Sequence, residues 1–250
     1  MSTDPVAVPE TQPTSQPETS ALGRMTGVIV SPTRTFGEIA RRPTWAVPLL
    51  ALWVLSIIVS GLLAEKTDWR SFFERQMSKN SRFDQMPQGQ KDNILEKQVQ
   101  YGPKFAFAFG VILTPIFVLF ITLVYWGAFN LFNGAALTFK QAFGMVSHAF
   151  VPLIISSLLA IIILVIKPHG DVDPEHFLAS SLGAFLPDDA PKWLAALGQS
   201  LELFWIWTLA LVAIGFSAAS PKKIKPAGAF LTVFGMWAVW VLGKVAFAMF

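Results

Sequence analysis

Long apolar stretches alternate with polar connections over most of the chain. A helix needs about 20 predominantly apolar residues to cross the roughly 30 Å hydrocarbon core of a bilayer. Five stretches meet or nearly meet that requirement, at residues 45–64, 105–131, 141–166, 203–219 and 227–249. The pattern predicts an all-α polytopic membrane protein, a five-helix transmembrane bundle within residues 45–250. Pro115 and Pro152 fall inside predicted spans, and we expect kinks there because neighbouring helices can satisfy the freed carbonyl groups.

An amphipathic segment precedes the first predicted span. Ser31 followed by Pro32 is typical of a helix N-cap and first helical position. Phe36 and Ile39 fall on one side of the helix, and arginines fall on the other. Residues 23–44 therefore predict an amphipathic interfacial helix that lies flat on the membrane surface.

Two further segments, between the first and second predicted spans, have the same kind of pattern. Residues 68–77 place large apolar side chains opposite charged ones, and residues 87–101 carry an apolar stripe. Both predict short helices that lie at the membrane surface or pack on the bundle. Residues 1–22 are rich in Pro, Ser, Thr, Gln and Glu and predict a disordered tail. They contain no basic region followed by an apolar run, so they do not resemble a signal peptide.

Composition supports the membrane prediction and excludes several classes of chemistry. Of the 250 residues, 53% are hydrophobic and 14% are charged, whereas soluble domains carry about 25% charged residues. The formal charge of +3 is too small to indicate nucleic-acid binding. The chain has no cysteine, which excludes disulfides, thiolate metal sites and cysteine nucleophiles.

Basic residues cluster beside some connections and not others. Lysines and arginines near span ends favour the cytosolic side. Four arginines precede the first span: Arg24, Arg34, Arg41 and Arg42. Lys140 lies between the second and third spans, and Lys222, Lys223 and Lys225 lie between the fourth and fifth. The loop after the third span is acidic instead, whereas the long loop at residues 65–104 is nearly balanced in charge. We therefore expect a cytosolic N-terminus.

Two ionisable residues lie at the edges of predicted spans. Glu202 begins the fourth span and Lys244 lies near the end of the fifth. Because the connection between these spans is short, we expect both on one side of the membrane, where they would form an intramembrane ion pair. Separate snorkelling of each to the interface is the simpler alternative. A small transporter or channel subunit would use this pair together with Asn130 and His148.

Enzymatic and metal sites receive little support. His148 and Ser217 invite comparison with an intramembrane hydrolase, but the surrounding sequence lacks the second glycine of a nucleophile elbow and an acidic orienting residue. The third loop holds a group of potential metal ligands, His169, Asp171, Asp173, Glu175 and His176. Their spacing matches no zinc or calcium pattern, which favours a solvated acidic loop. We predict no catalytic residue, cofactor or metal.

Three segments carry a resemblance to a known family. Ser31-Pro32, Phe36, Ile39-Ala40, Pro43, Trp45 and Pro48 resemble the start of prokaryotic members of the Yip domain family (Ypt-interacting protein one). The segment FKQAFGMVSHAFVPLIISSLL is similar to that family's third span. LGQSLELFWIWTLALVAIGF, a basic turn and AFLTVFGMWAVWVL are similar to its closing hairpin. The resemblance implies a five-span protein of a prokaryotic plasma membrane.

The functional expectation is a non-enzymatic component that organises the membrane or binds a partner. Eukaryotic relatives are tied to Rab-type GTPases, but this chain lacks their Asp-Leu-Tyr-Gly-Pro signature, which argues against GTPase binding. We expect membrane lipids, or a cytosolic or membrane protein, to contact a basic surface formed by Arg34, Arg41, Arg42, Lys222, Lys223 and Lys225. The simpler interpretation is that these charges only anchor and orient the spans.

Overall fold

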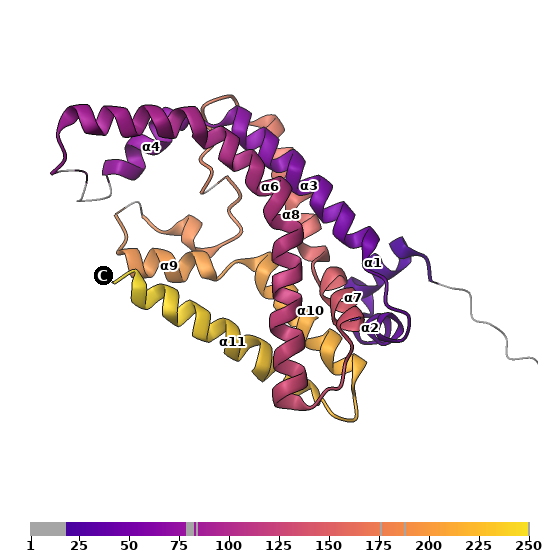
Figure 1. The fold of residues 1–250 in the computed structure, drawn as a ribbon. Helices are drawn as coiled ribbons and strands as arrows, with labels where there is room; N and C mark the ends of the chain where they lie inside the picture. Colours follow the sequence, from indigo (N-terminus) through magenta and orange to yellow (C-terminus); the bar gives the residue numbers. More distant parts are fainter. Residues whose placement is uncertain (1–18, 79–82, 84, 176, 188, 250) are drawn as a thin grey trace, which may run out of the picture.

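The computed structural model describes residues 19–78, 83, 85–175, 177–187 and 189–249. The helices in this part of the chain are α1 (Ala21–Val30), α2 (Pro32–Arg41), α3 (Ala46–Lys66), α4 (Trp69–Ser78), α6 (Gln88–Asn133), α7 (Phe139–Ala149), α8 (Val151–Ile166), the short 3-10 helix η1 (Leu182–Phe185), α9 (Lys192–Ser200), α10 (Leu203–Ala219) and α11 (Pro226–Phe247) (Figure 1). Within the described residues the one β-type pairing is an isolated bridge between Ser181 and Glu202.

The predicted all-α membrane fold is confirmed. Among the residues that the structure describes, four stretches are long and apolar enough to cross a membrane: Ala46–Lys66, Gln88–Asn133, Phe139–Ile166 and Pro226–Phe247. The fourth predicted span, residues 203–219, corresponds to α10, a shorter apolar helix of 17 residues. At 1.5 Å per residue, α10 is about 26 Å long, slightly less than the hydrocarbon thickness.

The helix α6 is longer than the sequence pattern predicts. The separate surface helix expected at residues 87–101 is wrong, because this segment continues into the second span as one helix of 46 residues. Pro103 and Pro115 both lie inside it. Figure 1 shows α6 changing direction along its length, as helices commonly do at proline.

The third predicted span is interrupted next to Pro152, where a kink was expected. α7 ends at Ala149, and α8 begins at Val151 with Pro152 in its first turn. Proline is tolerated there because a first-turn residue needs no intrahelical amide bond. The start of α7 carries a full capping box, in which the side chains of Thr138 and Gln141 bond each other's backbone amides.

The N-terminal segment contains two helices instead of one. Residues 23–44 were expected to form a single interfacial helix, but the chain breaks at Ser31 between α1 and α2. Ser31 occupies the predicted N-cap position without a capping hydrogen bond from its side chain. Residues 1–22 were expected to form a disordered tail, and residues 1–18 of that tail lie outside the described residues. The expectation of disorder is wrong for Ala21 and Leu22, because α1 begins at Ala21.

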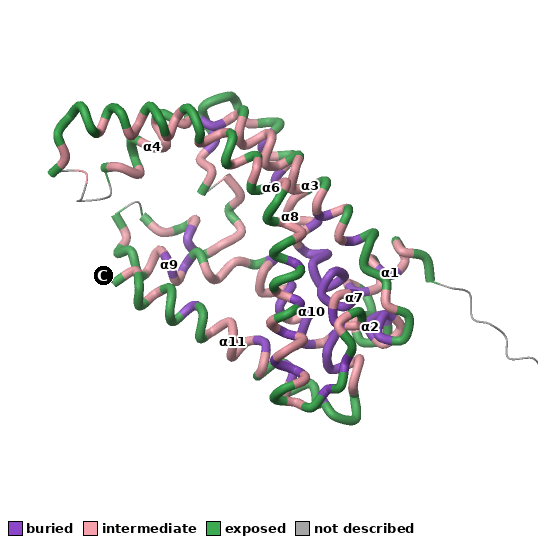
Figure 2. The backbone as a smooth tube through the Cα atoms, viewed as in Figure 1, coloured by how far each residue is buried: buried purple, intermediate pink, exposed green. Residues whose placement is uncertain are grey.

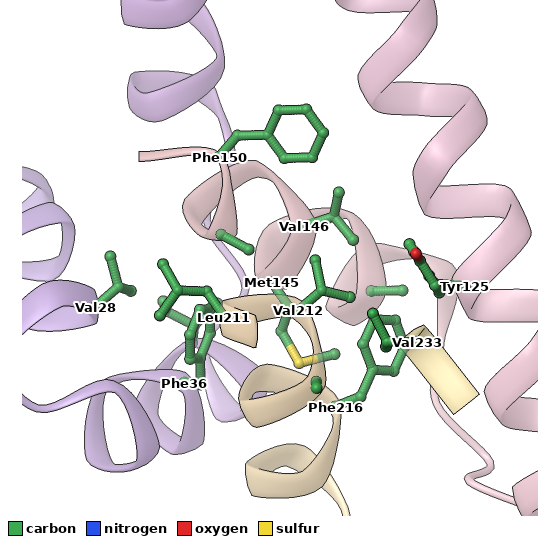
Figure 3. Close-up of a cluster of buried hydrophobic side chains, with 14 of the residues drawn as sticks. Val28, Phe36, Tyr125, Met145, Val146, Phe150, Leu211, Val212, Phe216 and Val233 are labelled. Carbon is green, nitrogen blue, oxygen red and sulfur yellow. The ribbon is translucent and has the colours of Figure 1, made fainter. Parts of the chain in front are cut away.

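Buried side chains concentrate where α2, α7 and α10 meet (Figure 2). Figure 3 shows residues from α1, α2, α6, α7, α10 and α11 converging on this region. Phe129 and Phe216 are fully buried and stack with their ring centroids 4.2 Å apart. The core thus ties the N-terminal helices to the transmembrane helices.

Two parts of the molecule extend away from this core. One consists of α4 with the adjoining part of α6, and the other consists of α9 with the C-terminal half of α11 (Figure 1). Several large apolar residues of α6 and α11 in these parts are exposed, such as Phe105 at 61% and Trp240 at 72%, whereas those of α4 are partly buried (Figure 2). Exposed apolar surface of this kind suits helices that face lipid.

Candidate functional site

The helix α2 is built into the bundle by its apolar side. Phe36 and Ile39 are fully buried, and α2 packs against α7 and α10. Gly215 of α10 allows this close approach, since a Cβ atom there would lie 3.2 Å from the Phe36 ring. The apolar face of α2 therefore covers protein, and its polar face remains exposed; that the helix lies flat on the membrane stays a prediction.

Side chains from two other helices bind backbone groups near the C-terminal end of α2. The last carbonyl groups of a helix have no partner within the helix. The Arg24 Nη1 atom donates to the Arg42 carbonyl oxygen at 3.0 Å and to Thr44 Oγ1 at 2.8 Å. The Gln141 Nε2 atom donates to the Ala40 carbonyl oxygen at 2.9 Å. These contacts from α1 and α7 fix where the exposed arginines of α2 stand.

The lysine-rich turn between α10 and α11 is held by its own internal contacts. Ser217 Oγ donates to the Ile224 carbonyl oxygen at 3.1 Å, and the Ile224 side chain is buried. Lys222, Lys223 and Lys225 around it are exposed. One buried isoleucine therefore anchors three outward-facing cations.

The two basic segments meet at a shared surface pocket of about 510 Å³. Its lining comes from α2, the start of α7 and the end of α10: Gly37, Ala40, Arg41, Gln141, Ala218, Ala219 and Pro221. Arg41 lines the pocket, and Lys222 directly follows the lining residue Pro221. We use the name basic surface for the exposed cations of these two segments, Arg34, Arg41, Arg42, Lys222, Lys223 and Lys225. Glu38 partly offsets this charge through a 3.3 Å ion pair with Arg34.

The predicted ion pair between Glu202 and Lys244 is replaced by other contacts. The Glu202 carboxylate caps α10, accepting from the amides of Phe204 at 3.1 Å and Trp205 at 2.6 Å. Lys244 Nζ lies 3.5 Å from Ser200 Oγ. Within the part of the chain that the structure describes, no ion pair joins Glu202 to Lys244. The acidic side chain at a helix N-terminus is satisfied by free amides, so it needs no lysine.

The polar residues considered for transport or catalysis have structural partners. Asn130 exchanges two hydrogen bonds with the Leu137 backbone, at 2.8 and 2.9 Å. His148 is fully buried, with Nδ1 2.8 Å from the Gly144 carbonyl oxygen. Ser217 bonds the basic turn, as described above. Ser217 and His148 thus bond different backbone groups, and their side chains do not form the hydrogen bond with each other that a catalytic pair requires.

The acidic loop after α8 packs on α4. Asp173 lies 3.8 Å from Arg75, and Glu175 accepts from Gln76 Nε2 at 2.8 Å. The Gly170 amide donates to the Lys66 carbonyl oxygen at 2.9 Å. His176 lies outside the described residues. The exposed loop therefore supplies partners for α4, a role that its spacing did not indicate.

Sequence reasoning missed Arg24 and Gln141. Both were assigned to general features: Arg24 to the basic flank and Gln141 to the start of a span. The signal for Arg24 was its place in ALGRMTGVIV, where one charge falls within an otherwise uncharged segment. A charge that becomes buried there needs hydrogen-bond partners, which the Arg42 carbonyl oxygen and Thr44 Oγ1 provide.

Comparisons with known proteins agree with this architecture. The Yip1 domain family matches residues 26–247. A membrane protein of Bacillus subtilis (strain 168), YknW, is 30% identical over 190 residues, covering 76% of this chain and 75% of that protein. No solved structure matches. The family match spans every apolar helix from α3 to α11 together with the basic surface, and the chain belongs to the Yip1 domain family of membrane proteins.

Proposed function

We propose that this protein is a non-enzymatic membrane component that binds an acidic segment of a protein partner at the basic surface. The observation that carries the proposal is the pocket shared by α2 and the α10–α11 turn, with Arg41 in its lining and Lys222 next to Pro221 at its edge. Two segments about 180 positions apart in sequence thus contribute to one recessed, positively charged place.

The way these segments are held supports binding over simple anchoring. A charge that only orients a span can remain on a mobile flank, because orientation depends on sign and position. Here Phe36 and Ile224 are buried, and Arg24 and Gln141 bond the end of α2. Binding benefits from such preorganisation, because less side-chain and backbone freedom is lost in the complex.

The proposal requires the basic surface to face the cytosol of a prokaryotic cell. The support is the excess of lysine and arginine at this end of the bundle, which favours the cytosolic side of a plasma membrane. Cytosolic partners with acidic segments would be attracted over about one Debye length, roughly 8 Å at physiological ionic strength. GTPase binding is not part of the proposal, because the signature pentapeptide of the eukaryotic relatives is absent.

A photo-crosslinking experiment in cells tests this function. A photoreactive residue at Gly37, which lines the pocket and has open space beside it, should capture a distinct protein adduct. Lys222→Glu combined with Lys223→Glu should reduce that adduct at least tenfold, because charge complementarity is lost. The matched control, Lys91→Glu with Lys192→Glu, reverses two charges away from the basic surface and should leave the adduct unchanged.

The outcomes separate the proposal from its alternatives. An adduct that persists in the Lys222→Glu/Lys223→Glu protein at equal membrane level would contradict recognition by charge. Absence of any protein adduct from Gly37, with crosslinks to lipid alone, would favour an anchoring role.

A further inference from the structure

A second recessed place lies between α4 and α6, away from the basic surface. It is an open groove of about 600 Å³. We call it the aromatic groove; its lining residues are Trp69, Phe72, Phe73, Lys97, Gln98, Tyr101, Gly102, Phe105, Ala106 and Phe109. None of the functions considered so far uses it.

Close packing between α4 and α6 forms one wall of the aromatic groove. Trp69, Phe72 and Phe73 contact each other with ring centroids 5.2 to 5.8 Å apart. A Cβ atom at Gly102 would lie 2.6 Å from the Phe73 ring, so the glycine allows the two helices to approach. The aromatic cluster is therefore a fixed surface that α4 presents along α6.

One end of the aromatic groove is polar. Lys97 and Gln98 line it, and the Gln98 Oε1 atom is buried without a hydrogen-bond partner. Lys104, which borders the groove without being one of its lining residues, follows about 10 Å farther along the helix, with Nζ 5.4 Å from the centroid of the Tyr101 ring. A buried acceptor without a partner costs free energy unless a ligand or water donates to it. This end therefore suits a group that combines negative charge with a hydrogen-bond donor.

The other end of the groove is apolar and exposed. Phe105 is 61% exposed and Phe109 is 55% exposed, and both belong to the uncharged part of α6 that is predicted to lie in the membrane. From Gln98 to Phe109 the helix rises about 16 Å at 1.5 Å per residue. The stretch from Gln98 to Lys104 would contact the headgroup, and the stretch from Phe105 to Phe109 would contact the first part of an acyl chain.

We propose that the aromatic groove binds a phospholipid whose headgroup is anionic and carries a hydroxyl donor, as phosphatidylglycerol does. Its phosphate lies by Lys97 and Lys104, a headgroup hydroxyl donates to Gln98 Oε1, and an acyl chain passes Phe105 and Phe109. The charge of the lysines selects an anion, and the unpartnered oxygen selects a donor.

Competition between lipids, followed by native mass spectrometry of the detergent-purified protein, tests the proposal. The probes are phosphatidylglycerol, phosphatidylmethanol and phosphatidylcholine with identical acyl chains. Phosphatidylmethanol has the charge without the hydroxyl, and phosphatidylcholine has neither net charge nor donor. The protein should retain phosphatidylglycerol about fivefold better than phosphatidylmethanol, the factor expected from one net hydrogen bond. It should retain phosphatidylcholine least.

Variants locate the binding on the protein. Gln98→Leu should remove the preference for phosphatidylglycerol over phosphatidylmethanol and leave the preference of both over phosphatidylcholine. Lys97→Ala with Lys104→Ala should remove the preference for anions. The matched control, Lys91→Ala with Gln100→Leu, changes one cation and one amide of α6 outside the groove lining and should behave as the parent protein.

Two results would overturn the proposal. The parent protein would retain the three lipids equally, or the Gln98→Leu protein would keep the full preference for phosphatidylglycerol over phosphatidylmethanol. The unfolding temperature of each variant in lipid-free detergent shows whether it is folded, so a loss of lipid is not confused with a loss of fold.

Discussion

Arg24 belongs to α1, yet its guanidinium reaches backbone and side-chain oxygens at the end of the next helix. It bonds the Arg42 carbonyl oxygen and Thr44 Oγ1, and only 7% of the residue is exposed. Hydrogen bonds from charged donors are stronger than neutral ones, and a buried cation without partners would be costly. The arginine thus links the sequence before the break at Ser31 to the segment that leads into α3.

Replacing Arg24 tests this link. Arg24→Met keeps much of the side-chain volume and removes the donors, and we expect a loss of about 1.5–3 kcal/mol in unfolding free energy. The control Arg34→Met removes an exposed arginine that pairs with Glu38 and should cost about 0–1 kcal/mol. Thermal unfolding in detergent measures both; equal effects of the two substitutions would contradict the assignment of Arg24.

Glu202 and Lys244 allow a second test at the same scale. Glu202→Ala removes the cap of α10 and should cost about 0.5–2 kcal/mol. Lys244→Ala removes an exposed side chain near Ser200 and should change stability by less than about 0.5 kcal/mol. In a double-mutant cycle the two changes should add within about 0.5 kcal/mol. A larger coupling energy would instead support the ion pair between Glu202 and Lys244 that was predicted from the sequence.

Helices of this protein approach each other closely at a few glycines. Gly144 of α7 faces the end of the α2 segment, and a Cβ atom there would lie 3.0 Å from the Thr44 carbonyl oxygen. A backbone oxygen cannot move aside as easily as the tip of a flexible side chain. Gly127 of α6 is also helical, but a Cβ atom at that position would have no neighbouring atom within 4 Å.

These two glycines form a matched pair for substitution. Gly144→Ala should destabilise the protein by about 1–3 kcal/mol through overpacking. Gly127→Ala should be neutral or stabilise it by up to about 1 kcal/mol, because alanine favours the helix. Unfolding temperatures in detergent compare the two proteins. A stabilising Gly144→Ala substitution would show that α7 does not pack tightly against the segment after α2.

The sequence predicts the elements of this fold well where a long apolar run decides them. The five runs correspond to α3, α6, α7 with α8, α10 and α11, since an apolar run of about 20 residues can satisfy its own backbone in a membrane as a helix. The prediction fails at boundaries that packing decides. A separate helix was expected to end before Pro103, but α6 continues through it. By composition, Ala21 was assigned to a polar tail. It is instead the first residue of α1, a helix that packs against α2 and α7.

At the scale of the whole molecule, successive apolar helices run in alternate directions, and this brings distant segments together at each end. The sequence correctly identified the cations of α2 and of the α10–α11 turn as neighbours of span ends. It could not reveal that both segments line one pocket, because this depends on how α2 packs against α10. The sequence could not predict the capping contacts of Glu202 and Gln141 for the same reason, because such a contact depends on which backbone group the side chain reaches in the folded structure.

Cysteine crosslinking in membranes tests most directly whether α2 and the α10–α11 turn form one surface. The chain has no cysteine of its own, so introduced thiols are unambiguous. Gly37→Cys and Pro221→Cys line the shared pocket without removing a charge. The account predicts that a short bis-maleimide joins this pair within one chain, and that both thiols react with a membrane-impermeant maleimide added from the same side. The control pair, Gly37→Cys with Glu65→Cys, should not be joined. Failure to crosslink Gly37→Cys to Pro221→Cys, or labelling of the two from opposite sides, would contradict the account.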